Sequence, residues 1–325
     1  MQTQAEPIFH EGEIAIQKKL GVAKRIETIA PRMIRDVMVE QHKTFYSALP
    51  YLFAGYHDQN DKVWASILVG KPGFISFPTD KKMHLKTSPL HNDPMVNAIK
   101  NADGLRIGLL GIDLSNRRRN RASTQLTATS DGKISLDVLQ AFGNCPQYIQ
   151  IRETEWKKDF KPEASTATKV TEFDGMIGKL IKNADTFFVA STSKNVDKDA
   201  QSRANGADVS HRGGQAGFVR VDDAKTLTIP DYRGNNLFNT LGNIEVNPHV
   251  GLLFIDFSTG DVLTLTGKAK TLWHSDAHLQ FKGAQRLWQF TLDHGFLLQN
   301  ALPMRWRFDE YSPVSLMTGT WDDDH

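Results

Sequence analysis

One structural pattern occurs twice in this chain of 325 residues, and this repeat constrains the fold more than any other feature. The segment 69–75 (VGKPGFI) returns as 213–219 (GGQAGFV), and 108–113 (GLLGID) returns as 251–256 (GLLFID). The two separations are 144 and 143 residues, so the order and the spacing of the matches agree. We therefore predict a duplicated β-rich unit, which can place a binding site between its two copies.

Length and composition bound the class of protein. A chain of 325 residues exceeds what one compact core usually organises, so we expect two domains. Hydrophobic residues make up 40% and charged residues 23%, as is ordinary for a globular protein in water. The net charge of +2 gives no global electrostatic reason to expect a nucleic acid or a membrane surface as partner. The single cysteine, Cys145, excludes an intrachain disulfide and a cysteine-rich metal site.

No targeting segment, membrane span or metal site is predicted. Residues 1–7 lack the basic start and apolar run of a signal peptide, and no stretch approaches about eighteen apolar residues. With one cysteine, which is compatible with a reducing compartment, this predicts a cytoplasmic protein. His274 and His278 have the spacing of a zinc pair, but no glutamate follows His274, and we expect no metal.

The residue pattern predicts mainly β-structure with flanking helices. The first fifty residues read as helical, with Gly21 placed to close a helix over 11–20. Short strands separated by turns then follow, for example over 51–57 and 63–69. Each half reads as a helix, antiparallel strands, a short helix and further strands, which favours a barrel or a sandwich. The expected domains are 1–156 for the N-terminal helices and first repeat, 157–168 for a polar linker, and 169–325 for the second repeat.

Two polar segments of the second copy are candidate anion sites. In 208–214 (DVSHRGG), Ser210, His211 and Arg212 place a hydroxyl, an imidazole and a guanidinium side by side, and arginine can hold a phosphate through two parallel charge-assisted bonds. In 233–243 (RGNNLFNTLGN), a glycine-containing loop leads into a helix start, which offers free amides to an anion. The alternatives are a polar hairpin turn for the first segment and helix capping by Thr240 for the second.

The segment 116–121 (NRRRNR) carries four arginines within five residues. In an alternating strand about half of them would face one side together, and one or two would point across a cleft between the copies at a phosphate. A solvated turn is the alternative. No aromatic residues interleave with the arginines, so we expect no nucleic-acid partner. Cys145 would need a base or positive charge nearby to act as a nucleophile, and a small buried residue is the favoured interpretation, so no catalytic side chain is assigned.

Taken in order, the motifs of the second copy resemble a known family. They are similar to the FMN-binding split barrel of proteins related to pyridoxamine 5′-phosphate oxidase. The resemblance covers residues 170–275 well and 40–150 more loosely. It rests on the segments 208–213, 217–223, 233–235, 239–244, 247–248, 251–256 and 265–269.

This resemblance implies a six-stranded Greek-key split barrel in each half, with FMN in a cleft between the two barrels. The family's phosphate loop carries an Arg-Lys pair where Gly242 and Asn243 stand here, which argues against the pyridoxamine phosphate activity. The first barrel has 64–69 where the second has 208–213 and lacks the histidine and arginine, so one FMN per chain is expected. The implied cofactor-binding residues are Ser210, His211, Arg212, Asn235, Asn236, Asn239, Thr240, Asn243 and Thr266, with Arg118 or Arg121 reaching from the first barrel.

The leading functional prediction is an FMN-dependent oxidoreductase. Hydride transfer would take place between the flavin and a small organic substrate or a nicotinamide, NADH or NADPH. A non-catalytic flavin carrier or sensor is the first alternative. A duplicated β-barrel interaction module, whose arginines contact a partner, is the second. The resemblance also leaves a homodimer open.

Overall fold

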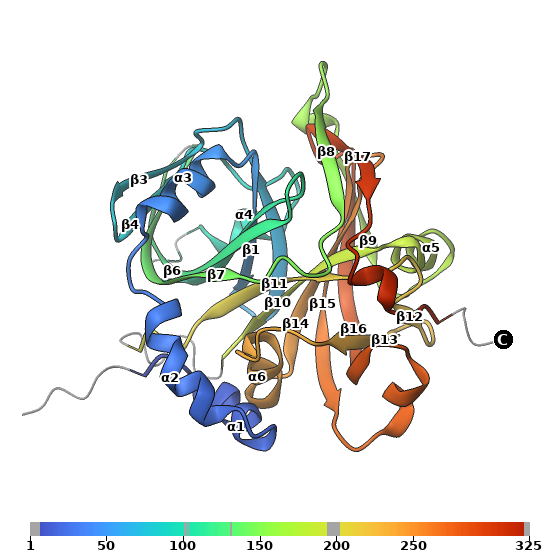
Figure 1. Ribbon diagram of the computed structural model, residues 1–325. Coiled ribbons are helices and arrows are strands. Elements are labelled where there is room, and N and C mark those ends of the chain that lie inside the picture. Colours follow the sequence, from blue (N-terminus) through green and yellow to red (C-terminus); the bar gives the residue numbers. More distant parts are fainter. Residues whose placement is uncertain (1–6, 101, 103, 131, 194–201, 322–325) are drawn as a thin grey trace, which may run out of the picture.

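Two antiparallel sheets, one of seven and one of eight strands, form most of the molecule (Figure 1). The computed structural model describes residues 7–100, 102, 104–130, 132–193 and 202–321, so most of the N-terminal segment used above to exclude a signal peptide lies outside the described residues. The strands are mostly buried on both faces or alternate between buried and exposed positions. The predicted fold class, mainly β with flanking helices, is confirmed.

The two sheets share one strand order, which explains the repeat in the sequence. The first runs β2-β1-β5-β6-β7-β4-β3 and the second β11-β10-β14-β15-β16-β13-β12, so that adding nine to each strand number converts one into the other; β9 also pairs with β16. The strands of the first sheet are β1 (Tyr51–His57), β2 (Val63–Val69), β3 (Ile75–Thr79), β4 (Lys82–Leu85), β5 (Arg106–Asp113), β6 (Arg118–Ser130) and β7 (Lys133–Asn144). Those of the second are β9 (Thr166–Val170), β10 (Thr186–Thr192), β11 (Ala207–Gly213), β12 (Arg220–Val221), β13 (Thr226–Tyr232), β14 (His249–Asp256), β15 (Asp261–Leu272) and β16 (Ala284–Gln299).

Helices flank the sheets at the places that the sequence predicts. The three N-terminal helices are α1 (Glu11–Lys19), α2 (Ala23–Met33) and α3 (Glu40–Ala48), and Gly21 closes the first with a φ of 69°. Each half then has a short helix among its strands, α4 (Met95–Ala98) before β5 in the first and α6 (Asn239–Val246) before β14 in the second; α5 (Gly175–Asn183) precedes β10. Short 3-10 turns lie at Pro162–Ala164, Asp276–Gln280 and Ser315–Met317. None of the described helices is long and apolar enough to cross a membrane.

The halves pack directly against each other through β1, β2 and β5 on one side and β10, β11 and β14 on the other. Phe53 and Phe188 stack across this contact with ring centroids 3.5 Å apart. The backbones approach so closely that a Cβ added to Gly108 would lie 2.5 Å from the carbonyl oxygen of Ala207. A glycine is therefore required there, because no other residue leaves room for the opposing strand.

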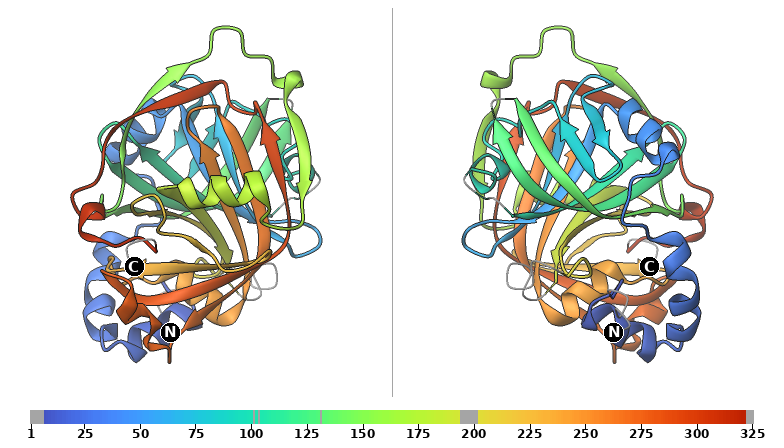
Figure 2. Two further views of the ribbon diagram at one scale, coloured as in Figure 1. Left: turned by 90° about the vertical axis from the view of Figure 1, so that its right-hand side faces the viewer. Right: turned by 90° about the vertical axis from the view of Figure 1, so that its left-hand side faces the viewer.

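A separate two-stranded antiparallel ribbon lies where the chain passes from one half to the other. It is formed by β8 (Ile151–Trp156) and β17 (Met304–Glu310), and one end of it projects beyond the sheets (Figures 1 and 2). The predicted linker, 157–168, follows β8, but its last residues already belong to β9 and pair with β16. At the base of the ribbon, Arg152 donates from Nη2 to both carboxylate oxygens of Asp185 at 2.7 and 2.6 Å. Both side chains are buried, so this ion pair ties the connection to the start of β10.

Candidate functional site

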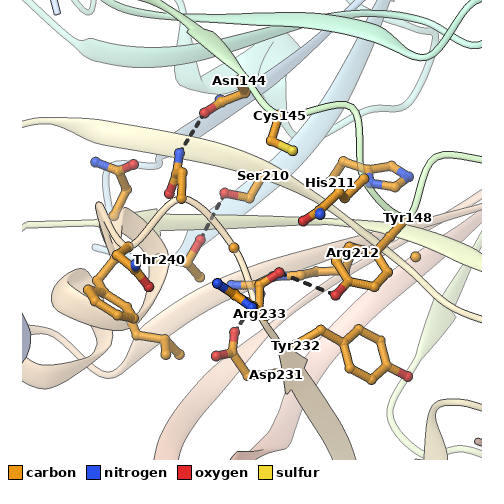
Figure 3. A pocket seen from close by; sticks show the side chains of 18 of the residues that line it. Asn144, Cys145, Tyr148, Ser210, His211, Arg212, Asp231, Tyr232, Arg233 and Thr240 are labelled. Atoms are coloured by element: carbon orange, nitrogen blue, oxygen red, sulfur yellow. Dashed lines mark hydrogen bonds and ion pairs between the residues drawn. The ribbon is translucent and has the colours of Figure 1, made fainter. Parts of the chain in front are cut away.

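A pocket with a volume of about 120 Å³ lies where the halves meet (Figure 3). The first half contributes β6 and the chain after β7, and the second contributes β11, the end of β13, the following loop and the start of α6. The residues that line it are Arg119, Arg121, Asn144, Cys145, Gln147 and Tyr148 from the first half, and Ser210–Gly213, Phe218, 230–236 and 238–241 from the second.

The pocket is strongly cationic. Arg119, Arg121, Arg212 and Arg233 line it, against one carboxylate, Asp231. Arg119 and Arg121 lie two residues apart on β6, so they share one face of the strand, as the alternation predicts. Such a surplus of guanidinium groups favours an anionic ligand, phosphate above all.

Among the three pocket arginines on β6 and β11, Arg119 is the one without a carboxylate partner in the described structure. Its Nε donates to the carbonyl oxygen of Cys145 at 2.7 Å, and its Nη1 lies 3.4 Å from Nδ1 of His211. Within the described part of the chain it forms no ion pair with a carboxylate. Burial, and then repulsion from Arg121, lowers the pKa of Arg119 to about 9. A bound anion would remove this penalty, because it would supply the missing opposite charge.

Arg118 does not reach the pocket, so the prediction for this residue is corrected to Arg119. The Arg118 guanidinium lies 4.8 Å from the ring centroid of Phe45, and its Nη2 donates to the carbonyl oxygen of Gln41. The reason is the alternation of β6, which turns residue 118 to the opposite face from 119 and 121.

Arg121 joins the first half to two elements of the second. Its Nη1 donates to Oδ1 of Asn239 at 2.9 Å, and its Nη2 lies 3.2 Å from Oδ2 of Asp208. Burial lowers the pKa of Arg121, whereas the Asp208 carboxylate raises it. Arg121 and Asn239 therefore lie together in the pocket as predicted.

On β11, Ser210 and Arg212 both line the pocket. The hydroxyl oxygens of Ser210 and Thr240 are 2.9 Å apart. Nη1 of Arg212 donates to Oδ1 of Asp231 at 2.6 Å, and the other oxygen of Asp231 accepts from Arg286 at 2.6 Å. Asp231, which the sequence did not single out, thus holds Arg212 in place and compensates part of its charge.

His211 is buried and neutral. Desolvation, together with the nearby Arg119, Arg152 and Arg212, lowers the pKa of this imidazole well below 6.5. Its Nε2 has no hydrogen-bond partner among the described residues. An orphaned buried ring nitrogen beside a cationic pocket fits a site that is completed by a ligand.

The loop before α6 is held in a fixed shape. Asn235 donates from Nδ2 to Oδ1 of Asn144 at 2.9 Å and accepts from the backbone amide of Leu237 at 3.1 Å. Asn236 and Phe238 both take left-handed backbone conformations, with φ of 63° and 62°. Phe238 is the N-cap of α6 and makes no side-chain capping bond, so the alternative interpretation, in which Thr240 caps this helix, is wrong. The Thr240 hydroxyl bonds to Ser210 instead.

Two predicted residues lie elsewhere. Asn243 donates to the hydroxyl of Ser191 at 2.9 Å and lines a neighbouring cavity. Thr266 lines a third cavity, because β10 and β14 separate its strand from β11.

An aromatic wall closes one side of the pocket. The rings of Tyr148 and Tyr232 stack with centroids 5.0 Å apart, and the Tyr148 hydroxyl donates to the carbonyl oxygen of Arg233 (Figure 3). The sequence carries no local signal for this pair, because the two residues come from different halves.

The N-terminal helix supports the site from behind. α1 crosses α6 so closely that a Cβ on Gly242 would lie 2.7 Å from Cα of Glu13. Glu13 accepts from Nδ2 of Asn239 at 2.5 Å and from the amide of His10 at 3.0 Å. Burial raises the pKa of Glu13 to about 8. A chain of contacts therefore runs from Glu13 through Asn239 to Arg121.

We expect the replacement Glu13→Gln to flatten the pH dependence of stability. The folded-state pKa of about 8 exceeds the ordinary 4.5, so the folded protein holds the proton more tightly than the unfolded chain. Glu13 therefore lowers the free energy of unfolding as the pH rises from about 4.5 to about 8. Because glutamine does not titrate, the variant should gain on the order of a few kcal/mol relative to wild type between pH 5 and pH 8. Urea unfolding of both proteins at pH 5 and pH 8 measures the two free energies of unfolding. A difference between variant and wild type that is the same at both pH values would contradict the raised pKa of Glu13.

The first half does not repeat the cationic pocket. The repeat aligns Ile67 and Leu68 with His211 and Arg212. Pairing of Gly108 with Ser123, and of Gly251 with Thr266, aligns Val262 and Thr264 with Arg119 and Arg121. The described structure thus holds this arginine set once per chain.

Neither a known family model nor a curated protein matches the sequence. Solved structures with partial similarity include HupZ of Group A Streptococcus, with 17% identity over 38% of this chain and 92% of that one, at a TM-score of 0.29. HutZ, the heme storage protein of Vibrio cholerae, has 16% identity over 38% of this chain and 92% of its own, at a TM-score of 0.26. A protein related to general stress protein 26, of the pyridoxinephosphate oxidase family, from Clostridium acetobutylicum has 12% identity over 46% of this chain and 94% of its own, also at a TM-score of 0.26. These similarities assign neither a cofactor nor an activity.

Proposed function

We propose that this protein binds FMN in the pocket between its halves and serves as a flavin-dependent oxidoreductase. The observation that carries the proposal is the half-buried guanidinium of Arg119, which has no carboxylate partner among the described residues, in a pocket lined by four arginines and one aspartate. The order of motifs in the second half supports the same cofactor.

The residues present fit the anionic end of such a cofactor. Arg119 and Arg121 would hold the phosphate, while the amide groups of Asn235 and Asn236 and the Thr240 hydroxyl can donate to and accept from a polyol chain. The volume of about 120 Å³ is below the roughly 300–1,000 Å³ that small-molecule pockets usually have. The pocket would therefore enclose the phosphate end, and the ring system would lie towards its mouth, near the tyrosine pair.

Bound FMN would supply hydride transfer to or from a small organic substrate or a nicotinamide. The chain itself contributes positive charge, which stabilises an anionic reduced cofactor. It also contributes a neutral His211, whose Nε2 can form one hydrogen bond to a ligand.

One observation favours the alternative of a non-catalytic flavin carrier or sensor. The only carboxylate among the described lining residues, Asp231, is held between Arg212 and Arg286, so it is poorly placed to move a proton. Turnover therefore decides between the two.

The experiment is an absorption spectrum of the purified protein before and after addition of FMN and removal of the excess. We expect retained bands at roughly 375 and 450 nm, the ordinary positions of oxidised flavin, and bleaching by NADH or NADPH under anaerobic conditions. Retention without bleaching by any tested donor would favour the carrier. Because one similar structure is a heme storage protein, hemin is titrated in parallel. Tight binding of hemin with no retained FMN would overturn the flavin assignment.

A further inference from the structure

We propose that the first half carries a second ligand site, which takes a small planar organic cation. The site is a cavity of about 620 Å³ between the β1–β2 turn, the start of α4 and β16. This volume lies within the range of roughly 300–1,000 Å³ that is usual for small-molecule pockets. The residues that matter to the argument are Asp58, Trp64, Asp93, His294 and Phe296, all of which line it.

Three aromatic side chains form one wall of the cavity. The Trp64 ring lies 5.3 Å from that of His294 and 6.0 Å from that of Phe296, centroid to centroid. The indole nitrogen of Trp64 donates to Oδ2 of Asp58 at 2.9 Å, which fixes the ring. Trp64 is 2% exposed and supports the wall from behind, whereas the half-buried His294 and Phe296 rings face the cavity side. Aromatic faces attract cations through the ring quadrupole.

A buried carboxylate without a cationic partner among the described residues, Asp93, lies next to the cavity. Oδ1 of Asp93 accepts from the Ser66 hydroxyl at 2.6 Å and the Tyr56 hydroxyl at 3.3 Å. Asp93 is 2% exposed, and its Oδ2 has no hydrogen-bond partner in the described structure. Burial raises the pKa of Asp93 to about 6, so the group is mostly ionised at neutral pH. A buried charge of this kind is costly unless an opposite charge approaches it.

The electrostatic character of the cavity is opposite to that of the cationic pocket between the halves, hereafter the arginine pocket. None of the described residues that line the cavity is a lysine or an arginine, whereas two aspartates, Asp58 and Asp93, line it. The two sites nevertheless share a framework, because the repeat aligns Ser66 with Ser210. Ser210 bonds to Thr240 at the start of α6, and Ser66 bonds to Asp93 just before α4. The serine occupies the same place in both halves, but only in the first half does it bond to a carboxylate at the start of the short helix; Ser210 bonds there to the Thr240 hydroxyl and, on its own strand, to Asp208.

The test uses 1-methylnicotinamide, a planar cation, and nicotinamide, its neutral counterpart of similar size, by isothermal titration calorimetry at pH 7.5. We expect saturable binding of the cation to the wild-type protein and at least about tenfold weaker binding of the neutral compound. Asp93→Asn removes the charge with little change in shape, and Phe296→Leu removes an aromatic face. Each should weaken cation binding about tenfold. Thermal unfolding shows whether each variant is folded. If only one of the two variants folds, that variant alone is enough for the test.

Two control variants locate the effect. Asp293→Asn removes a half-exposed carboxylate next to His294 that does not line this cavity, and Arg119→Met alters the arginine pocket alone. Both should bind the cation as the wild type does. The proposal is overturned if the wild-type protein binds neither compound saturably, if it binds both equally, or if folded D93N and F296L retain wild-type affinity.

Discussion

Replacing Arg119 by methionine should weaken FMN binding by about 10- to 100-fold, the effect of losing one or two hydrogen bonds from a charged donor. The same replacement at Arg118 should leave the affinity within about twofold, because this neighbour projects from the opposite face of β6 onto Phe45. Titration of FMN, followed by quenching of flavin fluorescence, compares the two variants with wild type. The pair is closely matched, since both changes remove one arginine from the same strand.

Stability gives an independent readout of the Arg119 variant. The wild-type guanidinium is half-buried and has no carboxylate partner within the described part of the chain, so its removal should leave the free energy of unfolding unchanged or raise it. Weaker FMN binding in a protein at least as stable as wild type would show that Arg119 is present for a ligand. Full FMN affinity in Arg119→Met, with a loss in Arg118→Met, would place the phosphate elsewhere.

Replacing Arg152 by methionine should lower the free energy of unfolding by about 3–5 kcal/mol, the usual cost of leaving one member of a buried ion pair unpaired. Asp185 would keep its charge in a buried position between the β8–β17 ribbon and β10. The matched control is Arg307→Met, on the other strand of the ribbon, whose ion pair with Glu153 is more than half exposed. That change should cost no more than about 1 kcal/mol. Urea unfolding measures both.

The double variant Arg152→Met/Asp185→Leu separates charge from packing. If the stranded carboxylate causes the loss, the double variant should be more stable than Arg152→Met alone, because no unpaired charge remains. A double variant as unstable as the sum of the two single changes would instead assign the loss to packing of Arg152 on Phe257.

The sequence predicted the fold better than the site, for a physical reason. Strand alternation, turn residues and the repeat are local signals, and they led to two sheets that prove to share one strand order. The segments around Ser210, Arg212 and Thr240 were found because each motif is continuous in the chain. Arg119 was missed because choosing between neighbouring arginines requires the phase of β6, which begins at a turn where Arg117 takes a φ of 63°.

Other parts of the site depend on contacts that no local pattern encodes. Glu13 meets Asn239 across 226 residues of sequence, and the Tyr148–Tyr232 stack forms only when the halves pack together. Thr240 looked like a helix cap because threonine often serves as one. The left-handed Phe238 takes that position instead and frees the hydroxyl for Ser210.

The arginine pocket takes its walls from both halves of one polypeptide, which has a consequence for dilute solution. A site shared between separate subunits disappears when the concentration falls below their dissociation constant. Here the two walls are tethered, so their assembly is an intramolecular event with a fixed effective concentration. Ligand affinity in this pocket should therefore be the same at nanomolar and micromolar protein, whether or not the chain also associates with a second copy.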